Sequence, residues 1–138
     1  MELKPYVFFY GRCEEALQYY KRIFGGSYEI MRNADAPPDV MREMGQVDRN
    51  RVMHSSFNAP GISFFASDGR ESKRIDPDEG NVALSITTHD VAEGERLCNA
   101  LAENGKVQMP FSDAFWGGKF GDVIDRFGNE WMITAPAT

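Results

Sequence analysis

The hydrophobic and polar positions of this 138-residue chain follow one order that occurs twice. In the first half, a β-branched and aromatic run over residues 6–10 predicts a strand, which Gly11 ends. Apolar residues then recur at helical spacing, namely Ala16, Leu17, Tyr20 and Ile23. Acidic residues in the first turn, basic residues in the last and Gly25-Gly26 afterwards are typical of a helix that begins near Cys13.

Three further strands are predicted in the first half. They cover residues 27–31, 51–57 and 62–67, and the turn Asn58-Ala59-Pro60-Gly61 joins the last two. Residues 33–50 carry two prolines and several charges, and they are longer than a typical connection. This segment is either a mobile excursion or a lid, with room for a short helical turn over residues 40–44.

The same order restarts at residue 82. Residues 82–87 predict a strand, and Asp90 caps a helix on which Leu97 and Leu101 are buried, with Glu93 reaching back as in a capping box. Asn104-Gly105 ends this helix. Strands are predicted over residues 106–111, 119–124 and 130–134, and Asp125-Arg126-Phe127-Gly128 joins the last two. The charged stretch 69–80 has no apolar period, so we expect a linker there.

The register of the two halves supports a duplication. Leu17 and Gly25 match Leu97 and Gly105 at one constant offset, and Pro60-Gly61 matches Phe127-Gly128 at a smaller one. We therefore predict an α+β fold in one domain, residues 1–138, built from two βαβββ modules at 1–68 and 81–138. Because neither module can bury both faces of a four-stranded sheet, we expect curved mixed sheets that pair around a concave space.

Composition and charge narrow the range of partners. The hydrophobic fraction of 42% is ordinary for a globular protein. The formal net charge is −6 and the basic residues are scattered, so we expect no nucleic-acid partner. The apolar runs are too short to span a bilayer and the amino terminus does not resemble a secretory signal, which predicts a cytoplasmic protein with no membrane partner. Cys13 and Cys98 lack metal-like spacing, which favours buried reduced thiols over a disulfide.

Two groups of short motifs carry a resemblance to a known family. The first group is Gly11-Arg12-Cys13-Glu14-Glu15-Ala16-Leu17, Tyr19-Tyr20 and Phe24-Gly25-Gly26. The second group is Phe115-Trp116-Gly117, Phe120-Gly121 and Asp125-Arg126-Phe127-Gly128-Asn129-Glu130-Trp131-Met132. Together, from Leu3 to Ala135, the chain resembles the PhnB-like branch of the vicinal-oxygen-chelate superfamily, which has the glyoxalase and bleomycin-resistance fold. The demethylubiquinone methyltransferase label sometimes given to this branch finds no support, because no glycine-rich loop follows a strand as a nucleotide-like cofactor needs.

The resemblance also bears on metal binding. Enzymes of the superfamily are expected to hold a divalent metal on the first strand of each module and on the last strand of the second. Pro5, Ser85 and Met132 match those positions to within one residue. Proline offers no donor atom, and a thioether is too soft for hard or borderline ions. Glu130 can face the same side at a period of two, but one carboxylate makes a poor site. The resemblance therefore implies a chain without the superfamily metal, and no cofactor is predicted.

The residues predicted to bind a ligand are His54, Asp68, Asp113, Phe115, Trp116, Phe120 and Trp131. The rings at 115–120 alternate with glycines that permit close approach of a ligand or another chain, and the alternative is that they plug the module interface. His54 can carry a proton near neutral pH or serve as a hydrogen-bonded interior side chain. The two aspartates suit a cationic ligand, or they bond nearby amides in turns. No serine or cysteine has a readable base beside it, so no catalytic residue is predicted.

Three functions are consistent with these residues. We favour a protein that binds a small organic molecule without converting it, because an acidic surface and an aromatic cleft suit a flat cationic ligand. The alternatives are a metal-dependent lyase, isomerase or dioxygenase acting on a small polar metabolite, and a scaffold whose cleft is filled by its own side chains. A homodimer is expected, because exposed ring-rich surface often marks association.

Overall fold

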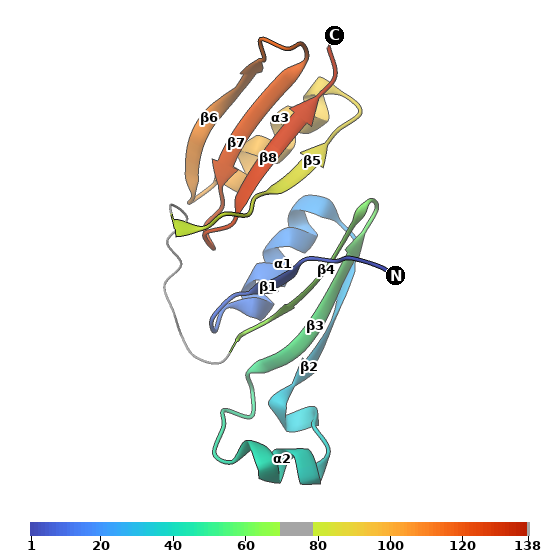
Figure 1. The fold of residues 1–138 in the computed structure, drawn as a ribbon, viewed down its shortest axis with the longest axis vertical. Coiled ribbons are helices and arrows are strands. Elements are labelled where there is room, and N and C mark those ends of the chain that lie inside the picture. The colour runs from blue at the N-terminus through green and yellow to red at the C-terminus, as the bar shows by residue number, and fades with distance from the viewer. Residues whose placement is uncertain (70–78, 138) are drawn as a thin grey trace. The chain divides into compact units, whose positions relative to one another are not determined.

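The computed structural model of the protein describes residues 1–69 and 79–137, which form two compact units (Figure 1). The first unit contains β1 (Tyr6–Phe8), α1 (Cys13–Phe24), β2 (Ser27–Arg32), a 3₁₀ turn η1 (Asn33–Asp35), α2 (Pro38–Met44), β3 (Val52–Ala59) and β4 (Ile62–Ser67). The second contains β5 (Leu84–Thr87), α3 (Val91–Ala102), β6 (Lys106–Asp113), β7 (Lys119–Ile124) and β8 (Glu130–Ala135). Most of the predicted linker at 69–80 lies outside the described residues.

The two units have the same sheet topology. The first sheet has the strand order β1-β4-β3-β2, and the second has the order β5-β8-β7-β6. In each sheet the first strand of the unit runs parallel to the last, and the other neighbours are antiparallel. The duplicated α+β fold with two mixed four-stranded sheets is therefore confirmed.

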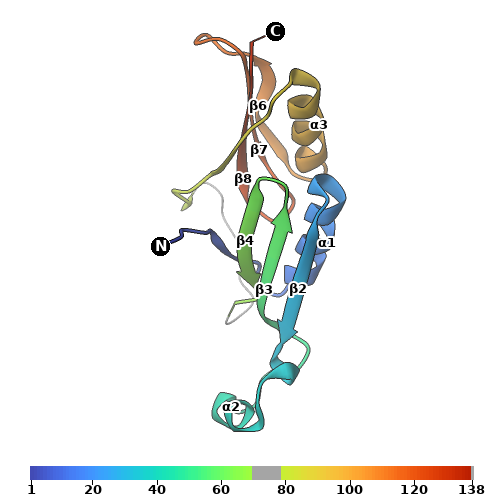
Figure 2. The same ribbon diagram turned by 90° about the vertical axis from the view of Figure 1, so that its right-hand side faces the viewer.

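One helix covers one face of each sheet. Figure 2 shows α1 beside the first sheet and α3 beside the second, while α2 lies beyond the ends of β2 and β3. Tyr20 of α1 packs edge-on against Phe64 at a ring-centroid distance of 5.9 Å, and Phe57 stacks on Phe64 at 5.0 Å. We call the face of each sheet opposite to its helix the open face.

The helices correct the predicted register of the repeat. Both α1 and α3 have 12 residues, and each of the four buried residues of α3 matches a buried residue of α1 when their first residues are aligned. The matching buried pairs are then Ala16 with Gly94, Tyr19 with Leu97, Tyr20 with Cys98 and Ile23 with Leu101. The predicted match of Leu17 with Leu97 was wrong by two positions, because the glycines after each helix were aligned instead of the buried stripes.

Of the two hydrogen bonds of the predicted capping box at α3, the structure shows the one accepted by the Asp90 side chain. Oδ1 of Asp90 accepts a 2.7 Å hydrogen bond from the backbone N–H of Glu93, as expected for an N-cap. The carboxylate of Glu93 pairs with Arg96 at 2.9 Å, rather than reaching back to Asp90. This hydrogen bond from Arg96 lowers the pKa of Glu93.

A glycine before the second strand of each unit is required by close packing. A Cβ on Gly26 would lie 2.1 Å from the carbonyl oxygen of Asn58, and one on Gly105 would lie 2.1 Å from that of Ile124. Both oxygens belong to the strand that pairs with the new one, so any side chain would push the two strands apart.

The remaining elements differ from the predicted ones mainly at their ends. The first strand stops at Phe8 because Tyr10 takes a left-handed backbone conformation with φ 47°. The connection at 33–50 contains η1 and α2, and Asn33 anchors it by donating a 2.8 Å hydrogen bond to the carbonyl of Asp48. None of the helices in the described ranges has the length and apolar character needed to cross a membrane.

Candidate functional site

Aromatic side chains gather on the open face of the first sheet. Tyr6 of β1 lies directly beside Phe65 of β4, which lies beside Ser56 of β3. Side chains alternate between the two faces of a strand, so Phe8 shares the face of Tyr6, and His54 shares the face of Ser56. We call Tyr6, Phe8, His54 and Phe65 the aromatic cluster.

The rings of the aromatic cluster contact one another. The centroid of Tyr6 lies 5.2 Å from that of Phe8 and 5.6 Å from that of His54, and His54 lies 5.3 Å from Phe65. The hydroxyl of Tyr6 is 3.0 Å from Nδ1 of His54, which is hydrogen-bonding distance. These contacts hold the imidazole against two aromatic rings, those of Tyr6 and Phe65.

Part of the cluster is accessible, and a cation lies beside it. Tyr6 is 42% exposed and Phe8 is 47% exposed, although both rings are large and apolar. The ammonium of Lys4 lies 5.0 Å from the centroid of Phe65, within cation–π range. The adjoining backbone is anchored, since Phe65 donates a 3.0 Å hydrogen bond to the carbonyl of Pro5. The cluster thus presents ring surface and basic groups together.

The open face of the second sheet carries acidic groups instead. Ser85, Met132 and Asp122 form one row across β5, β8 and β7. Glu130 stands two residues before Met132 and shares its face. Oδ1 of Asp122 is buried and has no hydrogen-bond partner within residues 1–69 and 79–137. Burial, followed by the charge of Glu130 and a hydrogen bond with it, raises the pKa of Asp122 to about 6.

This row lies where the family resemblance places two metal ligands, and its chemistry suits a divalent ion poorly. Met132 contributes a thioether, and the raised pKa of Asp122 favours a shared proton over two free carboxylates. No group of three or more His, Cys, Asp or Glu side chains in the described part of the chain is placed to hold a metal. The expected lack of a metal stays a prediction.

Trp131, which was predicted to bind a ligand, lies on the helix face of the second sheet. Its side chain is 3% exposed, and its indole N–H donates a 2.8 Å hydrogen bond to Oδ2 of Asp125. Oδ1 of the same aspartate accepts hydrogen bonds from the backbone of Phe127 and Asn129. The described contacts of Trp131 therefore serve the core and the turn between β7 and β8.

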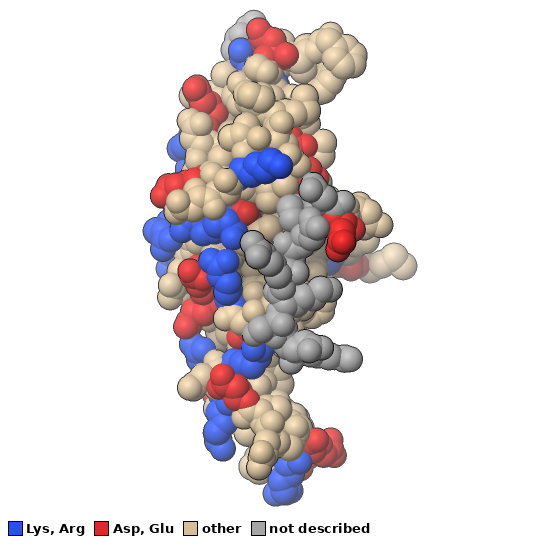
Figure 3. Space-filling view, turned by 90° about the vertical axis from the view of Figure 1, so that its left-hand side faces the viewer, with Lys and Arg blue, Asp and Glu red and all other residues tan. Residues whose placement is uncertain are grey.

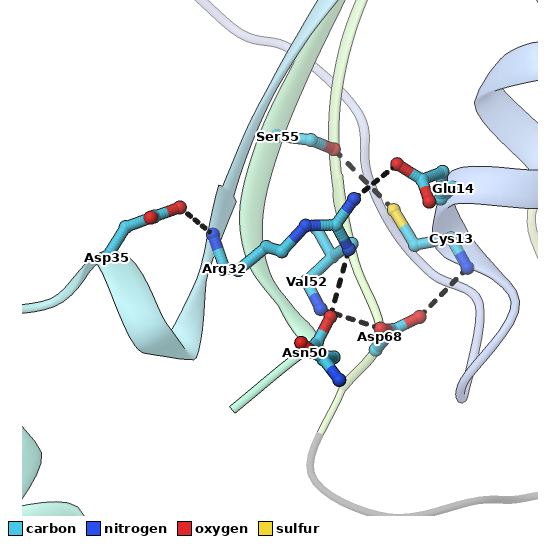
Figure 4. A network of polar contacts seen from close by, with 8 residues as sticks. All are labelled: Cys13, Glu14, Arg32, Asp35, Asn50, Val52, Ser55 and Asp68. Carbon is cyan, nitrogen blue, oxygen red and sulfur yellow. Dashed lines mark hydrogen bonds and ion pairs between the residues drawn. The ribbon is translucent and has the colours of Figure 1, made fainter. Parts of the chain in front are cut away.

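Asp68, a second predicted ligand residue, is buried at the start of α1 (Figure 4). Its Oδ1 accepts a 2.8 Å hydrogen bond from the N–H of Cys13, and Oδ2 accepts a 2.7 Å bond from the N–H of Val52. Both carboxylate oxygens are thus used to join the helix to β3. This arrangement matches the alternative in which Asp68 bonds nearby amides, and ligand binding by Asp68 has no support from its described contacts.

The same network surrounds Cys13 (Figure 4). Its Sγ lies 3.6 Å from Oγ of Ser55, and burial raises the pKa of the thiol to about 12. In the same network, Arg32 forms an ion pair with Glu14 and donates to the carbonyl of Asn50. Cys98 is also buried and free, and burial raises its pKa to about 11. The predicted buried reduced thiols are confirmed, and neither is activated as a nucleophile.

The other predicted ligand residues meet at the hairpin between β6 and β7. Trp116 makes edge contacts with Phe115 at 4.8 Å and with Phe120 at 5.6 Å, and Asp113 pairs with Lys119 at 2.9 Å. Phe115 is 97% exposed and Trp116 is 58% exposed. These residues lie in the second unit, whereas His54 lies in the aromatic cluster of the first.

Sequence reasoning missed Tyr6, Phe8, Phe65 and Asp122. The first three were recognised only as strand residues, although a period of two already groups Tyr6 with Phe8 and His54 with Ser56. Pairing β1 with β4 requires the tertiary structure, because the two strands are far apart in the sequence. Asp122 had a local signal, since it is a charged residue in the middle of the strand Lys119–Ile124, between Gly121 and Val123.

Charged side chains are mixed on the side drawn in Figure 3. Lysine and arginine lie interspersed with aspartate and glutamate, and outside the grey residues this view shows no continuous basic stripe. A protein that follows a nucleic-acid backbone usually presents such a stripe. This side of the protein therefore offers no support for nucleic-acid binding.

Comparisons with known proteins agree with this architecture. Residues 1–134 match the family described as 3-demethylubiquinone-9 3-methyltransferase. Protein YjdN of Escherichia coli is 30% identical over 140 residues, which cover 96% of this chain and 94% of YjdN. The crystal structure of PA1353 from Pseudomonas aeruginosa is 32% identical, with a TM-score of 0.83 over 100% of this chain and 99% of that one.

More distant structures share the fold. A Bacillus cereus PhnB protein, whose title also carries the methyltransferase description, is 23% identical, with a TM-score of 0.76 over 98% of this chain and 99% of that chain. A glyoxalase, bleomycin-resistance and dioxygenase domain from Frankia is 14% identical, with a TM-score of 0.55 over 96% of this chain and 86% of that domain.

Proposed function

Because the chain belongs to the 3-demethylubiquinone-9 3-methyltransferase family, in the PhnB-like branch of the vicinal-oxygen-chelate superfamily, we propose that it binds a small organic molecule without a metal. The aromatic cluster on the open face of the first sheet carries this proposal. The half-exposed rings of Tyr6 and Phe8 leave apolar surface in contact with water, which is unfavourable in free energy. A flat ligand that stacks on these rings would remove that surface from water.

The family description names a methyltransferase, but the sheet topology differs from that of folds that bind a nucleotide-like cofactor. The sheets that hold nucleotide-like cofactors are mostly parallel, with a glycine-rich turn between a strand and a helix. Among the strands of residues 1–69 and 79–137, only one pair of neighbours in each sheet is parallel. The turn from β1 into α1 reads Phe9-Tyr10-Gly11-Arg12, which has a single glycine. We therefore keep the proposal of binding and not of methyl transfer.

The hairpin rings extend the proposal to the second unit. Phe115, Trp116 and Phe120 form a connected ring group with high exposure, so they remain proposed ligand contacts. Variants of the two units can be compared directly. Phe8→Ala removes an exposed ring of the aromatic cluster, and Phe115→Ala removes an exposed ring of the hairpin.

A thermal-shift screen tests the proposal. The panel contains flat aromatic acids, amides and amines, phosphonates, and zinc, nickel and manganese salts. We expect aromatic compounds to raise the melting temperature of the wild type most and that of Phe8→Ala least. An equal response of all three proteins would place the ligand elsewhere. No response to any aromatic compound would favour the scaffold alternative.

A metal-dependent lyase, isomerase or dioxygenase is the second candidate. The neighbouring carboxylates of Asp122 and Glu130 favour it, because carboxylate oxygens are ligands that hard divalent ions accept. Calorimetric titration with zinc, nickel and manganese decides between the candidates. One-to-one binding at micromolar concentration, lost in Asp122→Asn, would support the enzyme and contradict the metal-free proposal.

A further inference from the structure

We infer that the aromatic cluster selects flat ligands that carry a carboxylate, and that His54 and Lys4 hold this group. The inference rests on the proposed function and names its ligand class. It also reverses the sequence-based expectation of a cationic ligand, because the charged groups beside the rings of the first unit are mainly basic.

The hydrogen bond between Tyr6 and His54 determines what the imidazole can offer. Tyr6 Oη and His54 Nδ1 are 3.0 Å apart, and either atom can be the donor, depending on the tautomer. Because a phenol is a stronger acid than a neutral imidazole, we infer that the hydroxyl donates to Nδ1, which places the ring proton on Nε2. If the imidazole is charged, both nitrogens carry protons, and Nε2 again donates. No residue in the described ranges is hydrogen-bonded to Nε2. His54 therefore has a donor left for an acceptor on a ligand.

Lys4 supplies a positive charge next to the same rings. Its ammonium lies 5.0 Å from the centroid of Phe65, and its side chain is 29% exposed. It also pairs with Glu2 at 3.0 Å, but Glu2 is 69% exposed. Exposed ion pairs of this kind contribute little free energy, so a ligand carboxylate that also contacts the rings can replace Glu2.

Glu29 of β2 is an acidic group on the same face, one strand away from His54 and two strands away from Phe65. Glu29 of β2 is paired in register with Ser56, which is paired with Phe65. Two strand spacings therefore separate Glu29 from Phe65, or roughly 10 Å. The Glu29 side chain is exposed, so solvent and salt screen its effect at that distance. An aromatic cation at the cluster would instead meet Lys4 directly.

Three ligands of one shape test the inference: 2-naphthoate, 2-naphthamide and 2-naphthamidine. Calorimetry measures their affinities for the wild-type protein. Because charge-assisted hydrogen bonds are stronger than neutral ones, we expect the acid to bind about tenfold more tightly than the amide, and the amidine to bind most weakly. Proton NMR follows the two histidines. The ring signals of His54 should shift with 2-naphthoate, and those of the exposed His89 should not.

Matched variants separate a direct contact from a change in folding. Lys4→Gln and Tyr6→Phe should each remove most of the preference for the acid while keeping the affinity for the amide. The controls are Lys21→Gln and Tyr28→Phe, because Lys21 lies 5.9 Å from the Tyr28 ring and Tyr28 pairs with the buried Phe57 on the helix face. Circular dichroism checks that all four variants fold.

The outcomes distinguish the preference for a carboxylate from the proposed binding of a small organic molecule. Equal binding of the three ligands, with loss of binding in Phe8→Ala, would overturn the preference for acids and leave the proposed function standing. Acid binding that is unchanged in Lys4→Gln and leaves the His54 signals unmoved would overturn the assigned residues. Failure of all three ligands to bind would contradict the proposed function itself, and the inference with it.

Discussion

The indole N–H of Trp131 and Oδ2 of Asp125 are joined by a 2.8 Å hydrogen bond inside the second unit. Asp125 is 2% exposed, so its charge depends on the hydrogen bonds that it accepts. The bond fixes the turn between β7 and β8 to a core side chain. Trp131 therefore has a structural role that its position in a sequence motif does not reveal.

The replacement Trp131→Phe should destabilise the protein. It keeps most of the buried ring but removes the donor to Asp125, and the loss of one donor to a buried charged group costs about 1–3 kcal/mol. Urea unfolding followed by circular dichroism measures the change. The matched control is Trp116→Phe, which alters an exposed ring and should change the free energy of unfolding by less than about 0.5 kcal/mol. Equal effects of the two variants would contradict the assignment.

Asp68 and Asp113 should respond very differently to removal of their carboxylates. Asp68→Ala leaves the amides of Cys13 and Val52 without their acceptor, so we expect a loss of about 2–4 kcal/mol. Asp113 is 87% exposed and pairs only at the surface with Lys119, so Asp113→Ala should cost less than about 1 kcal/mol. Chemical denaturation measures both. A stable Asp68→Ala protein would show that α1 does not need this carboxylate.

The stability contributed by Asp122 should fall as the pH rises. Its pKa is raised to about 6 in the folded protein, so the folded state prefers the protonated acid. This contribution is complete below the unfolded-state pKa and is lost as the pH passes through the folded-state value. Asp122→Asn should therefore be more stable than the wild type by about 1 kcal/mol at pH 7.5, and the difference should vanish near pH 4. Asp113→Asn is the control, and the same pH dependence there would refute the explanation.

Both cysteines should resist alkylation while the protein is folded. Burial raises the pKa of Cys13 to about 12 and that of Cys98 to about 11, so little thiolate exists at pH 8. Iodoacetamide should react at least about a hundredfold more slowly than with a free cysteine. Mass spectrometry of labelled peptides measures both sites, and labelling in urea gives the unfolded reference. Rapid labelling of either site in the native protein would be inconsistent with its burial.

The predicted homodimer should depend on the exposed hairpin rings. The double variant Phe115→Ser/Trp116→Ser removes apolar surface that a partner chain would cover, so the dissociation constant should rise about tenfold or more. Light scattering over a range of concentrations measures it. Val82→Ser is the control because Val82 is 76% exposed but lies outside the hairpin. A wild-type protein that is monomeric at every concentration would contradict the dimer.

The cytoplasmic location likewise stays a prediction, which cell fractionation tests.

Local patterns in the sequence determined the order and type of the elements. The strands Ile62–Ser67 and Lys119–Ile124 and the helix beginning at Cys13 agree with the predicted ranges. These predictions succeed because the periods of helices and strands and the conformations of turn residues depend on near neighbours. The duplicated order then limited the fold to two βαβββ units.

Tertiary structure alone decided which side chains form a site. Tyr6 and Phe65 become neighbours because β1 pairs with β4, and a shift of one residue in that pairing would place the other face of the strand there. Trp131 and Asp68 show the converse, since each looked available in the sequence and each is buried in the structure. Trp131 donates a hydrogen bond to Asp125, and Asp68 accepts hydrogen bonds from Cys13 and Val52. The sequence carries the chemistry of these residues, but strand register determines which of them a ligand can reach.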